Sequence, residues 1–186
     1  MISAKALNSD IRRRIMTIYL CGFMGCGKTT AGRLLAEKLG LEYTDMDSYI
    51  EEKTGMTIPR IFEEKGEEFF RNTETEAVAE LGKKGGVIAC GGGAMLKEIN
   101  AETAAGYGTV VYIDVPYDVC YDRISGDENR PIVMANTKES LGEIYNKRVP
   151  LYTAHSQLRV DGNRTPTEIA EDIRRAICKI QVKGSD

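Results

Sequence analysis

The clearest chemical signature in the chain lies between Gly22 and Thr30, in the stretch GFMGCGKTT. Its spacing fits the pattern G-x-x-x-x-G-K-[ST], in which glycines let successive backbone N–H groups point toward phosphate oxygens. Lys28 would neutralise the β- and γ-phosphates, and the Thr29 hydroxyl would ligate Mg²⁺. We therefore expect a nucleoside-triphosphate site made of Gly25, Cys26, Gly27, Lys28, Thr29 and Thr30, in which Cys26 only fills space between glycines.

Two carboxylates follow in the segment LEYTDMD, at Asp45 and Asp47. If this segment is a strand that ends in acids, both carboxylates face the same way, because side chains alternate along a strand. Such a pair beside a phosphate site could hold Mg²⁺ or orient a hydroxyl. An ordinary acidic turn is the alternative.

Charged residues and glycines recur further along the chain. Arg71 and Glu74 stand three residues apart on one face of an expected helix, where a surface ion pair is the plain alternative. The glycines at 91–93 follow an apolar segment and would let the backbone approach a ligand closely. Three arginines are associated with a polar, poorly periodic segment over 125–136: Arg123 precedes it, Arg130 lies within it and Arg148 follows it.

Short apolar segments alternate with helical patterns along the chain. We expect strands within 15–21, 41–47, 86–93, 109–115 and 156–162. We expect helices over 28–40, 48–55, 58–84 with a break near Gly66, 116–124, 137–149 and 165–180, the last with Thr165 as N-cap and Pro166 in first position. This alternation predicts a parallel sheet with helices on both faces, which binds ligands at the carboxyl ends of its strands.

The length, net charge and composition of the chain exclude several classes of protein. A chain of 186 residues is long enough for one well-packed domain, and its net charge of −3 argues against a dedicated nucleic-acid binder. No apolar run approaches the ~20 residues of a membrane span, and the N-terminal stretch lacks the apolar region of a secretory signal. Five cysteines without a CxxC pair, and a single histidine, predict reduced, mostly buried thiols in a cytoplasmic protein.

The kind of nucleotide-binding protein can also be narrowed. The guanine-reading pattern N-K-x-D is missing, since NKRV at 146–149 ends in valine. The chain is too small for the additional modules of motors and large ATPases. A small-molecule kinase is therefore the leading class.

The ordered set of motifs resembles the shikimate kinase family. It comprises a loop ending GCGKT, then D-x-D, G-E-x-x-F-R-x-x-E, GGG, an R-P pair in the polar segment and R-x-P-L-Y. The resemblance spans roughly residues 16–177. It implies transfer of the γ-phosphoryl group of ATP to the 3-hydroxyl of shikimate, in aromatic amino-acid biosynthesis. It also implies a three-layer α/β/α P-loop fold, similar to nucleoside-monophosphate kinases, with a five-stranded parallel sheet and a mobile lid.

The resemblance implies a role for each residue of the motifs. Asp47 would bind the reacting hydroxyl and act as its base, while Lys28 and Arg130 would supply positive charge to the transferring phosphoryl group. Thr29 and Asp45 would order Mg²⁺, and Arg123 and Pro166 would border the adenine. The shikimate contacts implied are Asp47, Arg71 and Arg148 on the carboxylate and hydroxyls, the backbone of Gly92 and Gly93, and Glu74 as the residue that holds Arg71.

We expect a single P-loop kinase domain over 15–181, with a lid at about 125–136, an extension over 1–14 and a tail over 182–186. Its partners would be ATP and shikimate, without nucleic acid or membrane, and a monomer is the default. Two alternatives remain open. One is another small-metabolite kinase of similar fold, such as gluconate kinase, and the other is a nucleotide-dependent switch that has lost its chemistry. The acidic pair and the three arginines speak against the switch.

Overall fold

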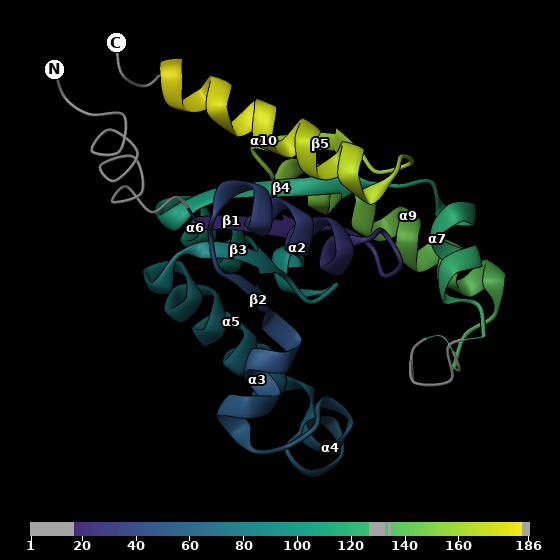
Figure 1. Ribbon diagram of the computed structural model, residues 1–186. Coiled ribbons are helices and arrows are strands. Elements are labelled where there is room, and N and C mark those ends of the chain that lie inside the picture. Colours follow the sequence, from purple (N-terminus) through teal and green to yellow (C-terminus); the bar gives the residue numbers. More distant parts are fainter. Residues whose placement is uncertain (1–16, 127–132, 134, 184–186) are drawn as a thin grey trace, which may run out of the picture.

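The computed structural model describes residues 17–126, 133 and 135–183. Five parallel strands form one sheet in the order β2-β3-β1-β4-β5 (Figure 1). The strands are β1 (Thr17–Cys21), β2 (Tyr43–Asp45), β3 (Gly86–Ala89), β4 (Gly108–Asp114) and β5 (Leu158–Asp161). The predicted five-stranded parallel sheet is confirmed. The expected extension over 1–14, most of the expected lid and Arg130 within it lie outside the described residues.

Helices pack on both faces of the sheet, so that the molecule has three layers (Figure 1). Helices α2 and α10 lie together on one face, and α5 and α6 pack together on the other. The helices are α2 (Lys28–Leu39), α3 (Met46–Thr54), α4 (Ile58–Glu64), α5 (Gly66–Lys84), α6 (Glu98–Tyr107), α7 (Tyr117–Ile124), α9 (Lys138–Ala154) and α10 (Pro166–Lys183), with a short 3-10 helix η1 (Ala94–Leu96).

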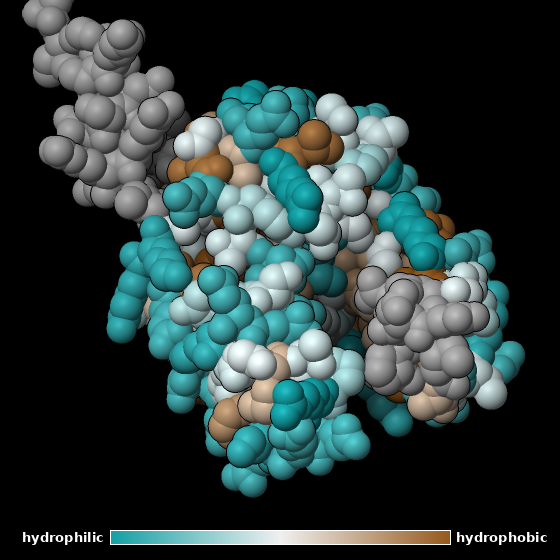
Figure 2. All heavy atoms as spheres, turned by 60° about the horizontal axis from the view of Figure 1, so that its bottom comes forward, coloured by the Kyte–Doolittle hydropathy of each residue, from teal (hydrophilic) through white to brown (hydrophobic). Residues whose placement is uncertain are grey.

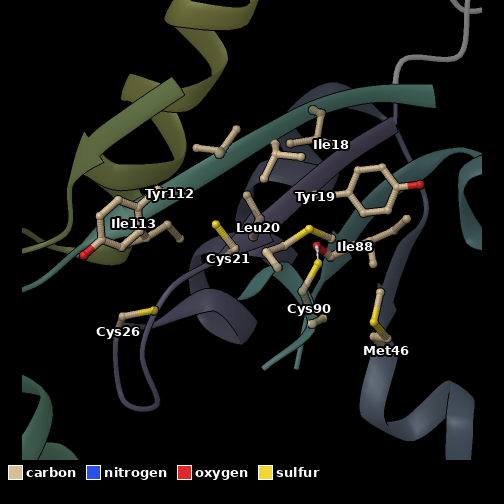
Figure 3. Close-up of a cluster of buried hydrophobic side chains, with 14 of the residues drawn as sticks. Ile18, Tyr19, Leu20, Cys21, Cys26, Met46, Ile88, Cys90, Tyr112 and Ile113 are labelled. Carbon is tan, nitrogen blue, oxygen red and sulfur yellow. Dashed lines mark hydrogen bonds between the residues drawn. The ribbon is translucent and has the colours of Figure 1, made fainter. Parts of the chain in front are cut away.

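The central strand β1 is buried along its whole length and contacts both helical layers. The hydroxyls of Thr17 and Tyr19 donate hydrogen bonds to backbone carbonyls of α5 at 3.0 and 2.8 Å. Leu20, on the other side of the strand, packs against Gly32 of α2. Figure 3 shows this core, with side chains of β1 among Ile88 of β3 and Tyr112 and Ile113 of β4. The strand that precedes the glycine loop is therefore held rigidly on both sides.

Strand β2 is shorter than predicted, and this corrects the placement of one carboxylate. The strand ends at Asp45, whose Oδ1 accepts hydrogen bonds from the backbone N–H groups of Asp47 at 3.2 Å and Ser48 at 3.3 Å. Aspartate is a favourable N-cap, so helix α3 begins at Met46. Asp47 therefore lies in the first turn of a helix, and the prediction of two alternate strand positions is wrong.

Two helices also depart from the sequence prediction. Helix α9 was expected to end at residue 149 but continues through Pro150 to Ala154, with Pro150 inside it. Helix α6 was not predicted, because its buried residues Ala101 and Ala104 are small and give little apolar periodicity. Its position is fixed instead by Asn100, whose buried amide donates to the Ala94 carbonyl at 2.9 Å.

The cysteines behave as predicted. Cys21, Cys26, Cys90 and Cys120 are buried, Cys178 is exposed, and all five are free thiols. Burial raises the pKa of the Cys21 thiol to about 12, so it stays protonated and unreactive near neutral pH. No helix in the described part of the chain is long and apolar enough to span a membrane.

A capping box opens α10, as predicted. Thr165 donates from its backbone N–H and its hydroxyl to Oε2 of Glu168, at 3.0 and 2.6 Å, and the Glu168 N–H donates back to Thr165 Oγ1 at 3.3 Å. These hydrogen bonds lower the pKa of Glu168. Their contribution is therefore present above the ordinary carboxylate pKa and is lost as pH falls through the lowered one.

We expect Thr165→Ala to reduce the free energy of unfolding by about 1 kcal/mol near pH 7, because the first-turn N–H groups lose their cap. Urea denaturation measures this change. The matched control is Thr103→Ala, which removes a hydroxyl that donates to the Ile99 carbonyl inside α6 and should change stability by less than about 0.5 kcal/mol. Equal effects of the two substitutions, or a Thr165→Ala deficit that persists unchanged at acid pH, would contradict the capping account.

Candidate active site

A cavity of about 600 Å³ lies at the carboxyl ends of the strands, where the glycine loop follows β1. Figure 2 shows a hollowed face of the molecule on which hydrophilic side chains predominate. The cavity is lined by Met24, Gly25, Cys26, Gly27, Lys28, Thr29, Thr30, Asp45, Asp47, Ala89, Cys90, Gly92, Arg123, Arg164, Pro166 and Ile169. Every described residue that we expected to contact ATP is therefore on its wall, and Arg130 lies outside the described residues. Arg164 was not predicted, and it pairs with Asp172 at 2.6 Å.

The glycine loop delivers the N-terminus of α2 to this cavity. Gly27 is the N-cap, with φ of 92°, no side chain caps the first turn, and no acidic residue lies in that turn. The N–H groups and the positive end of the helix dipole are thus available to an anion. Gly25 has φ of +79°, and a Cβ there would lie 2.7 Å from the Cys120 carbonyl oxygen, so both conformation and space require glycine.

Lys28 lies back across the loop. Its Nζ donates to the carbonyl oxygens of Gly22 at 2.9 Å and Phe23 at 3.1 Å and lies 3.6 Å from Cys26 Sγ. On the far side of the loop, Arg123 of α7 donates to the Gly25 carbonyl at 3.1 Å. Lys28 and Arg123 therefore hold the loop through its carbonyl groups, and the Cys26 N–H donates within the loop to the Phe23 carbonyl at 3.2 Å.

Asp45 and Asp47 both line the cavity, although they come from different elements. Oδ1 of Asp45 caps α3, which fixes the side chain at the end of β2. Asp47 reaches the glycine turn after β3, where its Oδ1 lies 2.6 Å from the point at which a Cβ of Gly91 would stand. The two carboxylates thus lie at different parts of the cavity wall, Asp45 toward α2 and Asp47 toward the turn at 91–93.

Two guanidinium groups meet at the same glycine turn. Nη1 of Arg71 lies 2.5 Å from the point where a Cβ of Gly93 would stand, and Nη1 of Arg148 lies 3.8 Å from that of Gly92. Arg148 also donates to the Gly92 carbonyl at 3.4 Å. Helices α5 and α9, distant in sequence, therefore bring two cations to this turn, and the Arg148 guanidinium also lies 5.9 Å from the ring centroid of Phe23 in the phosphate loop.

Glu74 holds Arg71 in this position. Its Oε2 accepts from Arg71 Nη1 at 3.0 Å, and the side chain is only 1% exposed. Burial raises the pKa of Glu74, against the lowering effect of Arg71, and the nearby Asp47 carboxylate raises it further. Oε1 of Glu74 is buried and has no hydrogen-bond partner among the described residues. An unpaired buried acceptor near Asp47 marks a place where a donor on a ligand would be favourable.

Tyr152 supports the glycine turn and was not singled out from the sequence. It is fully buried, stacks on Tyr112 with ring centroids 5.4 Å apart, and donates its hydroxyl to the Gly92 carbonyl at 2.5 Å. Its place at the end of the R-x-P-L-Y motif was a usable signal. Because the helix was expected to end at residue 149, Arg148 and Tyr152 were not placed together from the sequence. In the structure they lie one turn apart on one face of α9.

The donor set fits one kind of metal ion. The described residues contain no group of three or more His, Cys, Asp or Glu side chains that could hold a metal. Mg²⁺ does not need such a cage, since it keeps several waters and takes one or two protein oxygens together with substrate phosphates. Thr29 and Asp45 supply such oxygens beside the phosphate loop.

A phosphate loop between β1 and α2, two carboxylates on the cavity wall and two arginines at the turn after β3 define a P-loop kinase of small molecules. Neither Arg71 nor Arg148 is among the described residues that line the cavity itself. The family model for shikimate kinase matches residues 24–178. Relatives named shikimate kinase include that of Persephonella marina, 40% identical over 84% of this chain and 95% of the relative. That of Acinetobacter baumannii strain AYE is 41% identical over 89% and 94%. The chain belongs to the shikimate kinase family, whose members transfer phosphate to a hydroxyl of shikimate.

Solved structures agree with this assignment. The structure of shikimate kinase from Acinetobacter baumannii in complex with shikimate matches with a TM-score of 0.84 and 39% identity, over 92% of this chain and 97% of that one. A gluconokinase from Sinorhizobium meliloti matches with a TM-score of 0.57 over 91% and 97%. At 16% identity, this second likeness shows a shared fold alone.

We expect Tyr152→Phe to raise the KM for shikimate about fivefold while leaving the KM for ATP unchanged. The lost hydrogen bond to Gly92 is worth about 1 kcal/mol, and the turn is part of the acceptor side of the cavity. Steady-state kinetics in which each substrate is varied in turn measure the two KM values. The control is Tyr19→Phe, which removes another buried hydroxyl that donates to a backbone carbonyl but lies away from the cavity. Parallel changes in both KM values would show that Tyr152 only stabilises the fold.

Proposed function

We propose that this chain transfers the γ-phosphoryl group of ATP to the 3-hydroxyl of shikimate, giving shikimate 3-phosphate and ADP for aromatic amino-acid biosynthesis. One observation carries the proposal. Arg71 and Arg148 flank the turn at 91–93, and Asp47 lies against the same turn on the side that opens to the phosphate loop. We infer that a carboxylate would bind at the two arginines, a hydroxyl at Asp47 and phosphates at the loop, in that order.

Arg71 and Arg148 bind the carboxylate of the acceptor. A planar guanidinium matches a planar carboxylate and can donate two parallel hydrogen bonds to it. Glu74 keeps Arg71 oriented before the acceptor arrives, which reduces the entropy lost on binding. The backbone of Gly92 and Gly93 lies between the guanidinium groups of Arg71 and Arg148 and can approach the ring of shikimate closely. This local charge explains how a protein with net charge −3 attracts an anionic substrate.

Asp47 receives the hydroxyl that reacts. Its carboxylate accepts a hydrogen bond from that hydroxyl and takes its proton as the new bond to phosphorus forms. The fixed position of Asp47 on α3 orients the oxygen toward the loop at 22–28. Phosphoryl transfer depends more on positioning and charge neutralisation than on covalent help from the protein, and this arrangement supplies positioning.

The phosphate loop holds the donor. Backbone N–H groups of 25–30 and the first turn of α2 bind the phosphate oxygens, while Arg123 and Pro166 border the adenine. Lys28 exchanges its carbonyl partners in the loop for the β- and γ-phosphate oxygens. Arg130, from the lid proposed over 125–136, would add a second positive charge to the transferring group.

Thr29 and Asp45 would hold Mg²⁺, with Asp45 acting through water. The ion would neutralise charge on the β- and γ-phosphates and orient them for in-line transfer. Both side chains stand at the mouth of the cavity next to the first turn of α2, where water can complete the coordination shell. A cytoplasmic monomer completes the proposal, and light scattering of the purified protein tests the oligomeric state.

A coupled assay of ADP release tests the proposed activity. Purified protein with ATP and Mg²⁺ should release ADP steadily only after shikimate is added, and gluconate should not replace it. Mass spectrometry of the product should show one added phosphate. Release with gluconate but not shikimate would assign the chain to another small-metabolite kinase, and no acceptor-dependent release would mean that the chemistry is lost.

We expect Arg71→Lys to weaken shikimate binding at least tenfold while leaving ADP affinity within twofold. A lysine keeps the charge but cannot form the fork, and one charged hydrogen bond is worth about 1.5–3 kcal/mol. Isothermal titration with each ligand measures both affinities. Arg60→Lys is the control, because Arg60 forms an exposed ion pair with Glu64 on α4 and should not affect either ligand. If ADP affinity falls as much as shikimate affinity, Arg71 does not act on the acceptor alone.

A further inference from the structure

The side chain of Phe23 lies where the phosphate loop meets helices α7 and α9. Phe23 follows the first glycine of the loop, yet it is only 1% exposed and is not among the described residues that line the cavity. Its ring packs instead against α7 and α9, which lie side by side (Figure 1). The phosphate loop therefore places one large apolar side chain against the helix that carries Arg148.

The aromatic neighbours of Phe23 fix the orientation of its ring. Its centroid lies 5.3 Å from that of Tyr145, with an interplanar angle of 84°, and 6.4 Å from that of Tyr117. Edge-to-face pairs of this kind are favourable. The Tyr145 hydroxyl donates to the Val115 carbonyl at 3.0 Å, and the Tyr117 hydroxyl donates to the Lys138 carbonyl. The ring of Phe23 is therefore held by side chains that are themselves anchored to the backbone.

The guanidinium of Arg148 lies over this ring. Its Cζ is 5.9 Å from the centroid of Phe23, within the ~6 Å at which the face of an aromatic ring attracts a cation. Tyr145 and Arg148 are three residues apart in α9, so one face of the helix meets Phe23 with both side chains. The hydrogen bond from Arg148 to the Gly92 carbonyl is long, at 3.4 Å, and would hold the side chain only weakly by itself.

The two arginines at the turn after β3 are supported in different ways. Arg71 pairs with Glu67 and Glu74 and lies 5.1 Å from the ring centroid of Phe70, its neighbour in α5. Among the described residues, no carboxylate pairs with Arg148, and its aromatic partner comes from the phosphate loop. A ring attracts a guanidinium without accepting its N–H groups and without neutralising its charge. Both remain available to an anionic ligand.

The backbone of Phe23 belongs to the other half of the site. Its carbonyl accepts from Lys28 Nζ at 3.1 Å and from the Cys26 N–H at 3.2 Å. One residue thus contacts the lysine of the phosphate loop through its carbonyl and an arginine at the turn after β3 through its ring.

We propose that Phe23 is a positioning residue for the acceptor, whose ring holds the Arg148 guanidinium in place through a cation–π interaction. This inference rests on the proposed function, in which Arg148 binds the carboxylate of shikimate. It assigns a part in acceptor binding to a residue of the loop that binds the phosphates of ATP. Removal of the ring should therefore free Arg148 and weaken the binding of shikimate, while the cavity wall at the loop stays intact.

The mobility of Arg148 in the ligand-free protein tests the first half of the proposal. In protein whose arginines carry an NMR-active nitrogen isotope, the Nε–Hε signal of Arg148 is assigned by its absence from Arg148→Lys. For Phe23→Leu we expect the order parameter of this group to fall below about 0.6, the range of flexible groups. The signal of Arg71 should keep its order parameter, because its ion pair with Glu74 is untouched.

Isothermal titration tests the second half. In Phe23→Leu, shikimate affinity should fall about fivefold, the scale of one cation–π interaction that is partly shielded from water. ADP affinity should stay within twofold of the wild type, because the ring does not line the cavity. Pentafluorophenylalanine at position 23 keeps the shape of the ring but reverses the charge of its faces. It should weaken shikimate binding at least as much as Phe23→Leu.

The matched control uses the same two changes at Phe69. This residue is exposed on α5 and is not among the described residues that line the cavity. Phe69→Leu, and pentafluorophenylalanine at position 69, should leave the order parameter of Arg148 and the affinity for shikimate unchanged.

Each other result overturns the inference. An unchanged order parameter of Arg148 in Phe23→Leu would show that the ring does not hold the guanidinium. Full shikimate affinity with pentafluorophenylalanine at position 23 would show that only the shape of the ring matters. Equal losses of shikimate and ADP affinity in Phe23→Leu would assign Phe23 to the folding of the loop. Failure of the proposed function is a separate outcome, since the wild type would then not bind shikimate while Phe23→Leu still freed Arg148.

Discussion

The close approach of side chains to the turn at 91–93 is the constraint on which the acceptor side of the cavity depends. Asp47 from α3, Arg71 from α5 and Arg148 from α9 reach this turn, and the points where side chains would begin at Gly91 and Gly93 are already occupied by their polar atoms. A Cβ at either glycine would therefore require the side chain of Asp47 or Arg71 to move. Because β3 is a buried inner strand of the sheet, the turn at its end has a fixed position, and the three helices take their relative positions from it.

The same convergence explains the electrostatics of the site. Burial disfavours the charged form of Glu74 and raises its pKa, and the nearby Asp47 carboxylate acts in the same direction. The ion pair with Arg71 acts in the opposite direction. Under the proposed function, Arg71 would be shared between the buried carboxylate of Glu74 and the acceptor. We infer that the unpaired Oε1 of Glu74 and the two arginines together determine which acceptor binds. A ligand that forms hydrogen bonds with only one of these groups leaves the others without partners.

Much of this arrangement could be predicted from the sequence, since its signals are local. The G-x-x-x-x-G-K-[ST] spacing, the Thr165 capping box and the alternation of strands and helices each depend on neighbouring residues, and the structure has all three. The acidic pair was placed on a strand because alternation was visible, whereas the N-cap preference of Asp45 ended the strand. That choice depended on a competition between two local signals of similar strength.

Long-range packing could not be predicted in this way. The R-x-P-L-Y motif marks Tyr152 but does not indicate that its hydroxyl meets Gly92, and the ring of Tyr43 packs where it does because Gly32 of another element leaves room for it. Pro150 suggested a helix end, yet α9 continues because its buried residue Tyr152 packs in the core beyond it. Tertiary contacts of this kind override local preference.

Substitution of Gly93 by alanine tests the central claim most directly. The backbone at Gly93 has φ of −107° and ψ of −16°, which alanine adopts without strain, so the only obstacle to a methyl group is Nη1 of Arg71 at 2.5 Å. If the turn sets the acceptor site, isothermal titration of Gly93→Ala should show shikimate affinity reduced at least tenfold, with ADP affinity unchanged. Gly106→Ala is the control, because a Cβ at Gly106 meets nothing within 4 Å. Unchanged shikimate affinity in Gly93→Ala would contradict the account.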